Sequence, residues 1–249
     1  MITPQDHYIY ISTPSIQDVK FKIILIGGTT ISATVNKATP YRYFIGDGDN
    51  TQLFESSSNT GKVTNKGFII ESEGLVYANV RTNAGGFNQA GGLVSKGISA
   101  LGKRFRAGAM LNSSNISGLL NFFSILATEN NTEVKISNIP NGTLLANNTT
   151  FNASDPPINL NKNESYILAI NNNTGGNLIG ALIESNKNIV VNSGSFGGTN
   201  DPSNNSNAGR DIGFDQIVGA DKIGSDYIFI KGKGTDVLER VLLIADSDN

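Results

Sequence analysis

Short apolar runs separated by polar turns make up most of the chain. Residues 7–11, 19–26, 29–35 and 41–45 are rich in β-branched and aromatic side chains, in the manner of strands. No segment carries apolar residues at a helical period over a dozen positions, and only residues 94–100 fit a single helical turn. The pattern therefore predicts an all-β protein.

The same spacing continues through the second half of the chain. Further strands are predicted at residues 101–111, 121–128, 132–137, 142–146 and 160–170. With the two strands expected next, seven short strands fall within about 100 residues, the number typical of an antiparallel β-sandwich. A β-propeller or a jelly roll is the alternative, because counting strands does not fix their order.

One motif occurs twice in the chain. Residues 68–79 and residues 180–196 both read as an apolar run, Glu-Ser, a polar turn and a second apolar run, which predicts a β-hairpin. Residues 222–229 begin a further, incomplete copy of the surrounding pattern. The repeat predicts tandem β-sandwich modules and a chain that is a piece of a longer protein. The expected parts are module 1 at residues 1–98, module 2 at residues 99–213, and the start of a third module at residues 214–249.

Composition and charge exclude several classes of function. Of the 249 residues, 38% are hydrophobic, enough for the cores of one large or two ordinary domains. The formal net charge is -2, and no Lys/Arg cluster is interleaved with aromatic residues, so we expect no nucleic-acid binding. The apolar runs are far shorter than the roughly 20 residues of a membrane helix, so we expect no membrane insertion. The absence of cysteine excludes disulfides and thiolate chemistry.

Few residues offer catalytic chemistry. His7 is the only histidine, so a Ser-His-Asp triad would depend on it, and we expect an exposed strand residue instead. Glu71 and Glu184 suggest the paired acids of a glycosidase. Because they occupy the same position in both copies of the motif, a structural role is expected, such as capping a turn through Ser72 and Ser185. We therefore expect no enzyme activity.

A calcium loop is one candidate for a bound ion. Asp47 and Asp49, followed by Asn50, supply two carboxylates and an amide, and residues 246–249 offer a less clear copy. Neither stretch has the later Glu of a full ligand series, so a plain turn is the default prediction. Calcium at Asp47 and Asp49 is the one metal hypothesis that the sequence offers, and no other cofactor is expected.

The loop at residues 197–213 is the stretch where we expect ligand binding. It is longer than most connections, and long loops are often functional. Arg210, Asp211 and Asp215 are the candidate ligand contacts, and the alternative is an ion pair that fixes the link between modules. Tyr41 and Tyr43, two residues apart on one strand, are the pair that could stack on a sugar, since Trp is absent.

Three motifs in series resemble a known family. They are Leu-Ile-Gly-Ala-Leu-Ile-Glu-Ser from residue 178, Gly-Arg-Asp-Ile-Gly-Phe-Asp-Gln-Ile-Val from residue 209, and Ile-Gly-Ser-Asp-Tyr-Ile from residue 223. The series resembles the domain at the N-terminus of IgG-Fc-binding proteins, and more closely the form found in exported surface proteins of Bacteroidetes of the gliding-motility and adhesin type. The resemblance implies an extracellular, noncatalytic interaction module of a larger cell-surface protein.

The expected function is adhesion or ligand binding through polar loops carried by a rigid β scaffold. The partner would be an extracellular glycan or protein, together with neighbouring modules of the same chain, and any signal and sorting segments would lie outside this sequence. A structural spacer module of a surface fibre is one alternative. A carbohydrate-active enzyme is another, and it would need a cleft with two convergent acids.

Overall fold

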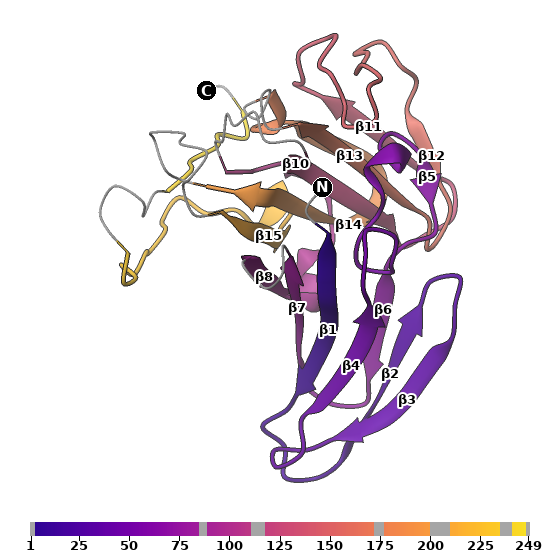
Figure 1. Cartoon of the computed structure of the whole chain (residues 1–249), viewed down its shortest axis with the longest axis vertical. Coiled ribbons are helices and arrows are strands. Elements are labelled where there is room, and N and C mark those ends of the chain that lie inside the picture. The colour runs from indigo at the N-terminus through magenta and orange to yellow at the C-terminus, as the bar shows by residue number, and fades with distance from the viewer. Residues whose placement is uncertain are drawn as a thin grey trace.

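The structure is a computed structural model that describes residues 3–84, 89–110, 118–171, 177–199, 210–234 and 241–247. Its strands form two bodies along the long axis, a first body of early strands and a second body of later ones (Figure 1). One sheet of 12 strands runs through both bodies, and a sheet of three strands belongs to the first. Neither sheet closes into a barrel among the described strands, which is consistent with a β-sandwich. The all-β prediction is confirmed.

Helices are limited to single 3-10 turns in the part of the chain that the structure describes. They are η1 (Ser57–Asn59), η2 (Gly97–Ala100) and η4 (Ala220–Lys222). The turn η2 lies where one helical turn was predicted. None of the described helices has the length and apolar character needed to cross a lipid bilayer.

The first body consists of two facing groups of strands. One group runs in the order β4 (Tyr41–Gly46), β1 (Pro4–Ser12), β7 (Tyr77–Ala84) and β8 (Gln89–Val94), and the other in the order β3 (Thr30–Val35), β2 (Val19–Leu25) and β6 (Phe68–Ser72). Ile9 and Ile11 on the inner face of β1 are fully buried in one cluster with Phe21 and Ile23 of β2. Alternate residues of a strand point to opposite faces, so this alternation leaves the residues between them facing outward.

The second body encloses the larger core. Its strands are β9 (Gly102–Arg106), β10 (Leu120–Ala127), β11 (Thr132–Ser137), β12 (Ile158–Leu160), β13 (Ser165–Asn171), β14 (Leu182–Gly198) and β15 (Asp211–Ile217). Phe105, Phe123, Leu168 and Ile183 come from four of these strands and are all almost fully buried in one cluster. The long strand β14 contributes to the whole body, because four other strands pair with it.

The hairpin predicted at residues 180–196 is wrong, because this segment is one continuous strand. The first part of β14 pairs with β11 and β9, whereas the part from Ile189 onward pairs with β10 and β15. Ser185 Oγ donates a 2.6 Å hydrogen bond to the carbonyl of Lys187, so the polar residues make a local irregularity and the chain does not reverse. The prediction failed because a bend within one strand and a reversal between two strands can both show the same apolar-polar-apolar sequence pattern.

The hairpin predicted at residues 68–79 is also wrong. β6 pairs with β2, and β7 pairs with β1 and β8, so the turn between them carries the chain from one sheet to the other. Ser72 Oγ donates a 2.7 Å hydrogen bond to the carbonyl of Gly74, two residues further on, as Ser185 does in the second copy. The repeated serines therefore make the same local hydrogen bond, at a turn in the first copy and within a continuous strand in the second.

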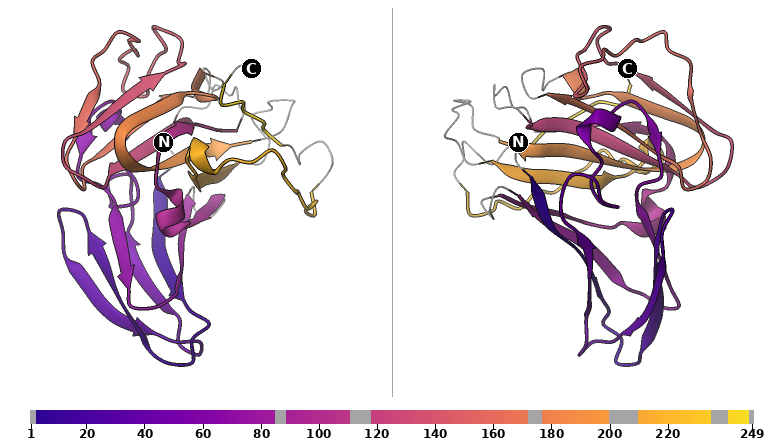
Figure 2. Two further views of the ribbon diagram at one scale, coloured as in Figure 1. Left: turned by 180° about the vertical axis from the view of Figure 1, so that it is seen from behind. Right: turned by 45° about the vertical axis from the view of Figure 1, so that its right-hand side comes forward.

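Two strands tie the bodies together. β5 (Val63–Thr64) pairs with β13, and the hydroxyl oxygens of Thr64 and Ser165 lie 3.0 Å apart. β15 pairs with β14 and also forms a parallel bridge to β8 between Ile212 and Gly91. A Cβ at Gly91 would lie 2.3 Å from the Ile212 carbonyl oxygen, so only glycine allows this approach. Figure 2 shows from two sides how the strands of the two bodies meet at this junction.

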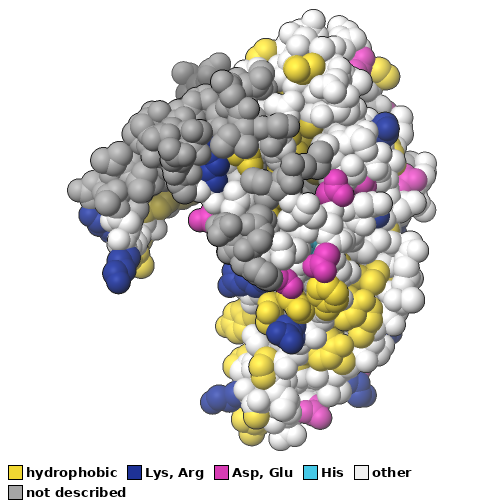
Figure 3. Space-filling model, in the orientation of Figure 1, with side chains coloured by type: hydrophobic (Ala, Val, Ile, Leu, Met, Phe, Trp, Pro, Cys, Tyr) yellow, Lys and Arg dark blue, Asp and Glu magenta, His cyan; other side chains and the backbone are white. Residues whose placement is uncertain are grey.

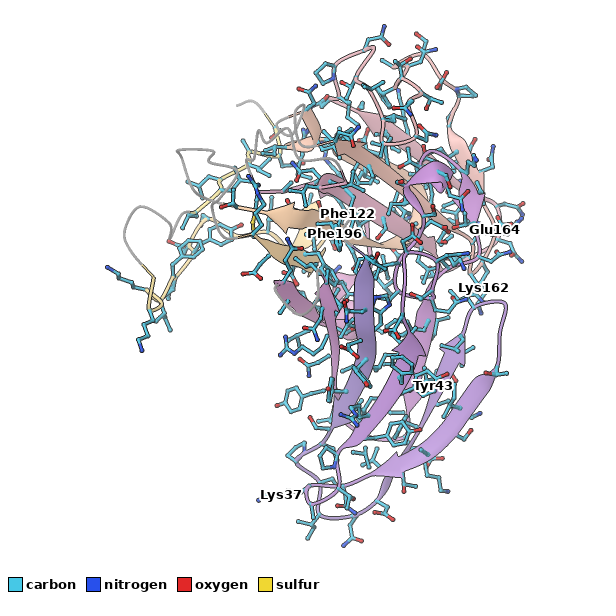
Figure 4. All side chains as sticks on the ribbon, viewed as in Figure 1. Lys37, Tyr43, Phe122, Lys162, Glu164 and Phe196 are labelled. Atoms are coloured by element: carbon cyan, nitrogen blue, oxygen red, sulfur yellow. The ribbon has the colours of Figure 1, made fainter. Side chains whose placement is uncertain are left out.

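A small apolar cluster fills the junction. Its buried members are Ala84, Phe196 and Ile212. The ring of Phe54 lies 5.7 Å from the ring of Phe196 and 4.7 Å from that of His7, so one aromatic side chain contacts both bodies. Figure 4 shows Phe196 close to Phe122 of the neighbouring strand.

The division into three modules stays a prediction. β15 spans the expected boundary after residue 213 and pairs within the second body. Residues 223–234 and 241–247 contain no strand, and residues 235–240 of the expected third part lie outside the described residues.

Candidate functional site

His7 is buried, which corrects the expectation of an exposed strand residue. Its side chain has no exposed surface, and its Nδ1 lies 3.1 Å from Thr51 Oγ1. Burial lowers the pKa of His7, while the negative charges of Asp47 and Asp6 act in the opposite direction. The inward position follows from the alternation along β1, because His7 lies two residues before Ile9 and four before Ile11, which are buried on the same face. A residue that no solvent reaches is part of the packing at the junction and cannot meet a substrate in this structure.

The two repeated acids lie in different sheets. Glu71 is exposed on β6 opposite Lys22 of the three-stranded sheet, whereas Glu184 on β14 accepts a 2.5 Å hydrogen bond from Arg104. This placement favours the structural roles predicted for them.

One of the two carboxylates of the predicted calcium site makes a hydrogen bond within the protein. Asp47 Oδ1 accepts a 2.6 Å hydrogen bond from the backbone N–H of Asp6. Across the described ranges, no group of three or more His, Cys, Asp or Glu side chains is placed to hold a metal ion. Calcium at Asp47 and Asp49 stays a prediction, and residues 248 and 249 of the second stretch lie outside the described residues.

The predicted ligand loop is described only at its ends, because residues 200–209 lie outside the described residues. Arg210 is 8% exposed, and Asp211 Oδ1 accepts a 3.1 Å hydrogen bond from the backbone N–H of Ala90 at β8. Asp215 Oδ2 pairs with Lys96 Nζ at 2.6 Å. Both acids therefore contact the chain around the end of the first body.

The aromatic pair proposed for sugar stacking is wrong. Tyr41 and Tyr43 of β4 pack against the core of the first body, and Tyr41 lies edge-on to Phe21 at 5.1 Å. Figure 4 shows Tyr43 between β4 and the facing sheet. The sequence could not decide which face of β4 is inward, because Tyr41, Tyr43 and Phe44 are all aromatic.

The outward aromatic residues of this sheet include Tyr8 and Tyr10 of β1, Phe44 of β4 and Tyr77 of β7. The Tyr8 ring lies 5.2 Å from the Phe44 ring and 6.0 Å from the Tyr10 ring. Figure 3 shows hydrophobic side chains gathered on this side of the first body, with basic residues among them. The signal for the two tyrosines was present in the sequence, since they alternate with Ile9 and Ile11.

Two arginines and one amide complete this surface. Tyr8 lies opposite Phe44 and Arg81 in the strand registers, and Tyr10 lies opposite Arg42 and Asn79. The Arg42 guanidinium carbon lies 4.9 Å from the centre of the Tyr8 ring, a cation–π distance. We call this surface the aromatic face, and its members are Tyr8, Tyr10, Arg42, Phe44, Asn79 and Arg81.

The second body carries a different surface, where basic side chains are paired. Arg104 pairs with Glu184 at 2.5 Å and with Asp246 at 3.0 Å, and Arg106 Nε lies 3.4 Å from Asp246. The hydrogen bond to Asp246 is the main cause that raises the pKa of Arg104. A hollow of about 360 Å³ lies beside Arg106 and Asp246. No local sequence pattern indicates these pairs, because Arg104 and Asp246 are 142 positions apart.

A segment near the end of the chain exposes four apolar residues in a row. Tyr227, Ile228, Phe229 and Ile230 are 59%, 95%, 62% and 93% exposed. The segment projects away from the second body (Figures 1 and 2). Contiguous exposed apolar surface on a folded protein often marks an interaction site.

Comparison with known proteins gives one family. A family model described as IgGFc binding protein matches residues 93–249, more than half of the chain, from the end of β8 onward. No curated protein and no solved structure matches the chain. The matched segment includes the paired arginines, the predicted contacts of β15 and the exposed apolar segment, whereas the aromatic face precedes it.

Proposed function

We propose, from the premise that this chain belongs to the IgGFc binding protein family, that it is a noncatalytic adhesion module of a larger, exported surface protein. The observation that carries the proposal is the family match over residues 93–249. The family is one of binding domains and suggests an extracellular module with a protein partner. The origin in an adhesin of the gliding-motility type is part of this proposal.

The contact surface that we propose for the protein partner is the exposed segment Tyr227–Ile230. It lies inside the matched residues, and Ile228 and Ile230 are both more than nine-tenths exposed. In a protein interface, aromatic and aliphatic anchors of this kind supply most of the binding free energy. Lys231 and Lys233 follow directly and would form the polar rim.

The test is binding to a panel of immobilised extracellular proteins, with IgG Fc as the first probe because the family is described by that ligand. A Tyr227→Ser, Phe229→Ser variant should bind at least about tenfold more weakly, since interface anchors contribute roughly 2 kcal/mol or more each. The matched control is Ile16→Ser, Leu75→Ser, which removes two apolar residues of the first body that are even more exposed, at 79% and 87%. Equal binding by both variants would contradict the assigned surface, and a folded chain that binds no protein on the panel would count against the proposal itself.

A structural spacer is the second candidate, and one observation favours it. Asp211 and Asp215, the predicted ligand contacts, meet the Ala90 amide and Lys96 at the end of the first body. Contacts of this kind would stiffen the junction between two bodies. An Asp211→Ala, Asp215→Ala variant separates the two roles. If the two acids contact the ligand, the variant should bind the partner more weakly at an unchanged melting temperature. If they hold the junction, the variant should have a lower melting temperature and unchanged binding.

A further inference from the structure

We propose that the aromatic face of the first body is a binding site for a sugar that carries a carboxylate group. The site precedes the family-matched residues, so this inference goes beyond the proposed protein-binding function and does not depend on it. Its argument rests on three features of the face: the exposed rings, the unpaired arginines and a hollow between them.

The rings are arranged as a platform. Tyr8, Tyr10 and Phe44 lie on the outer side of an open sheet, with ring centres 5.2 and 6.0 Å apart along the series. Phe44 is 48% exposed, and both tyrosines are partly exposed. The π faces of such rings attract the polarised C–H groups on one side of a pyranose ring, and the tyrosine hydroxyls can bond the hydroxyls at its edge. The contacts among the three rings, and the contact of Tyr8 with the Arg42 guanidinium, restrict the rotamers before binding, so less rotamer freedom is lost when a ligand binds.

The two arginines of the aromatic face carry positive charges that are not paired with acids among the described residues. Neither Arg42 nor Arg81 has an ion-pair partner among the described residues, and both are exposed. Other basic side chains do pair with acids, among them Lys20, Lys96, Arg104, Arg106 and Lys222. A free guanidinium beside an aromatic ring suits the planar, bidentate geometry of a carboxylate.

None of the described acids forms an ion pair with either arginine. Asp6 Oδ2 lies 3.5 Å from the side-chain nitrogen of Asn83, and Asp47 accepts a hydrogen bond from the Asp6 backbone. The six members of the face carry two positive charges and no negative charge, although the protein as a whole has a formal net charge of -2. This local charge favours an anionic ligand.

A shallow hollow gives the ligand a position. It measures about 350 Å³ and is lined by Tyr10, Asn79 and Arg81, which supply an aromatic ring, an amide and a cation. This volume falls within the roughly 300–1,000 Å³ range of small-molecule sites. Gly92 leaves room for the Arg81 side chain, since a Cβ there would come within 2.7 Å of Arg81 Nη1. The amide of Asn79 can both donate to and accept from sugar hydroxyls.

Titration of the full chain with three oligosaccharides, followed by NMR or calorimetry, tests the site. The probes are sialyllactose, an oligogalacturonate and neutral lactose, so that the two sources of a carboxylated ring are compared with a ring that lacks the charge. We expect one or both acidic sugars to bind at least about tenfold more tightly than lactose, because hydrogen bonds to charged groups contribute roughly 1.5–3 kcal/mol. Equal binding of all three, or binding of none by a folded chain, would overturn the proposal.

Variants place the site. Arg42→Gln, Arg81→Gln should lose the preference for the acidic sugar, and Tyr10→Leu should weaken binding of every sugar while it keeps an apolar side chain on the sheet. The matched control is Lys22→Gln, Lys62→Gln, which removes the same charge from exposed positions elsewhere in the chain. A control variant that loses as much affinity as the arginine variant would show general charge attraction and refute a site on the aromatic face. Unchanged melting temperatures exclude unfolding as the cause.

Discussion

The two bodies differ in how much they bury and in what they leave available. The second body buries 17 apolar residues in one cluster, whereas the first buries six. In the second body Arg104 and Arg106 are paired with acids, whereas Arg42 and Arg81 of the first body are not. The comparison teaches that similar β architecture can present two kinds of contact surface, a cationic aromatic face on one body and an apolar segment on the other.

The largest expected effect comes from the larger core. Phe123→Ala should destabilise the protein by about 3–5 kcal/mol, the usual cost of truncating a buried Phe, because Phe123 has no exposed surface. Since β5 and β15 attach to this body, protection from amide hydrogen exchange should fall in both bodies. In the matched variant Phe21→Ala, protection should fall in β2, β3 and β6 and persist in β10 and β14. The reverse pattern would contradict the view that the first body depends on the larger core of the second.

Alkaline pH should affect the second body through Tyr166. Burial raises the pKa of Tyr166 to about 12, with a smaller contribution from Asp155. As pH rises past about 10 the unfolded chain loses this proton while the folded chain keeps it, so stability should fall between about pH 10 and 12, by about 2–3 kcal/mol. Denaturant titrations across this pH range should show that the free energy of unfolding declines less steeply with pH for Tyr166→Phe than for the wild type. The same flattening in Tyr10→Phe, a change on the outer face, would disprove the assignment.

The junction should be sensitive to one added methyl group. Gly91→Ala places a Cβ 2.3 Å from the Ile212 carbonyl oxygen, so the bridge between β8 and β15 must shift, at a cost of about 1–3 kcal/mol. Chemical denaturation measures the loss. Gly224→Ala is the control, because its Cβ would meet nothing closer than 3.9 Å, and it should leave stability nearly unchanged. Equal stability of the two variants would mean that the bodies are not held at this bridge.

The smallest effect is expected from His7. Burial lowers its pKa, and the partial compensation by Asp47 and Asp6 limits the shift. Stability from this group is complete above the unfolded pKa of about 6.5 and is lost as pH falls below it, since the unfolded chain takes up the proton first. Melting curves recorded from pH 7.5 downward should show that the melting temperature falls less steeply with pH for His7→Gln than for the wild type. A slope identical to that of the wild type would contradict the buried position.

The sequence predicted the strands better than their partners. Alternation of Ile9 and Ile11 with Tyr8 and Tyr10 predicts a strand with one buried face, and this is what β1 shows. A local pattern does not distinguish a reversal of the chain from a bend within a strand, so the sequence predicts a hairpin at residues 180–196. In the structure β14 continues through this segment, and β10, β11 and β15 pair along it.

The site was predicted least well, because its parts come together only in the fold. Tyr41 and Tyr43 look as suitable for sugar stacking as Tyr8 and Tyr10, and only the register of β1 against β4 shows which pair faces outward. Arg81 reaches the face from a strand about 70 positions after β1, through cross-strand pairing with Tyr8. Whether an arginine is paired depends on acids that can lie even further along the chain, as for Arg104 and Asp246, which are 142 positions apart.

The most direct test of the central claim is a crossed measurement on two double variants. Arg42→Gln, Arg81→Gln and Arg104→Gln, Arg106→Gln each remove two arginines, one pair from each body, and both are assayed for melting temperature and for binding of the acidic sugar. We expect the first variant to keep its melting temperature and lose binding, and the second to melt lower and keep binding. Loss of binding in the second variant with no loss in the first would contradict the account.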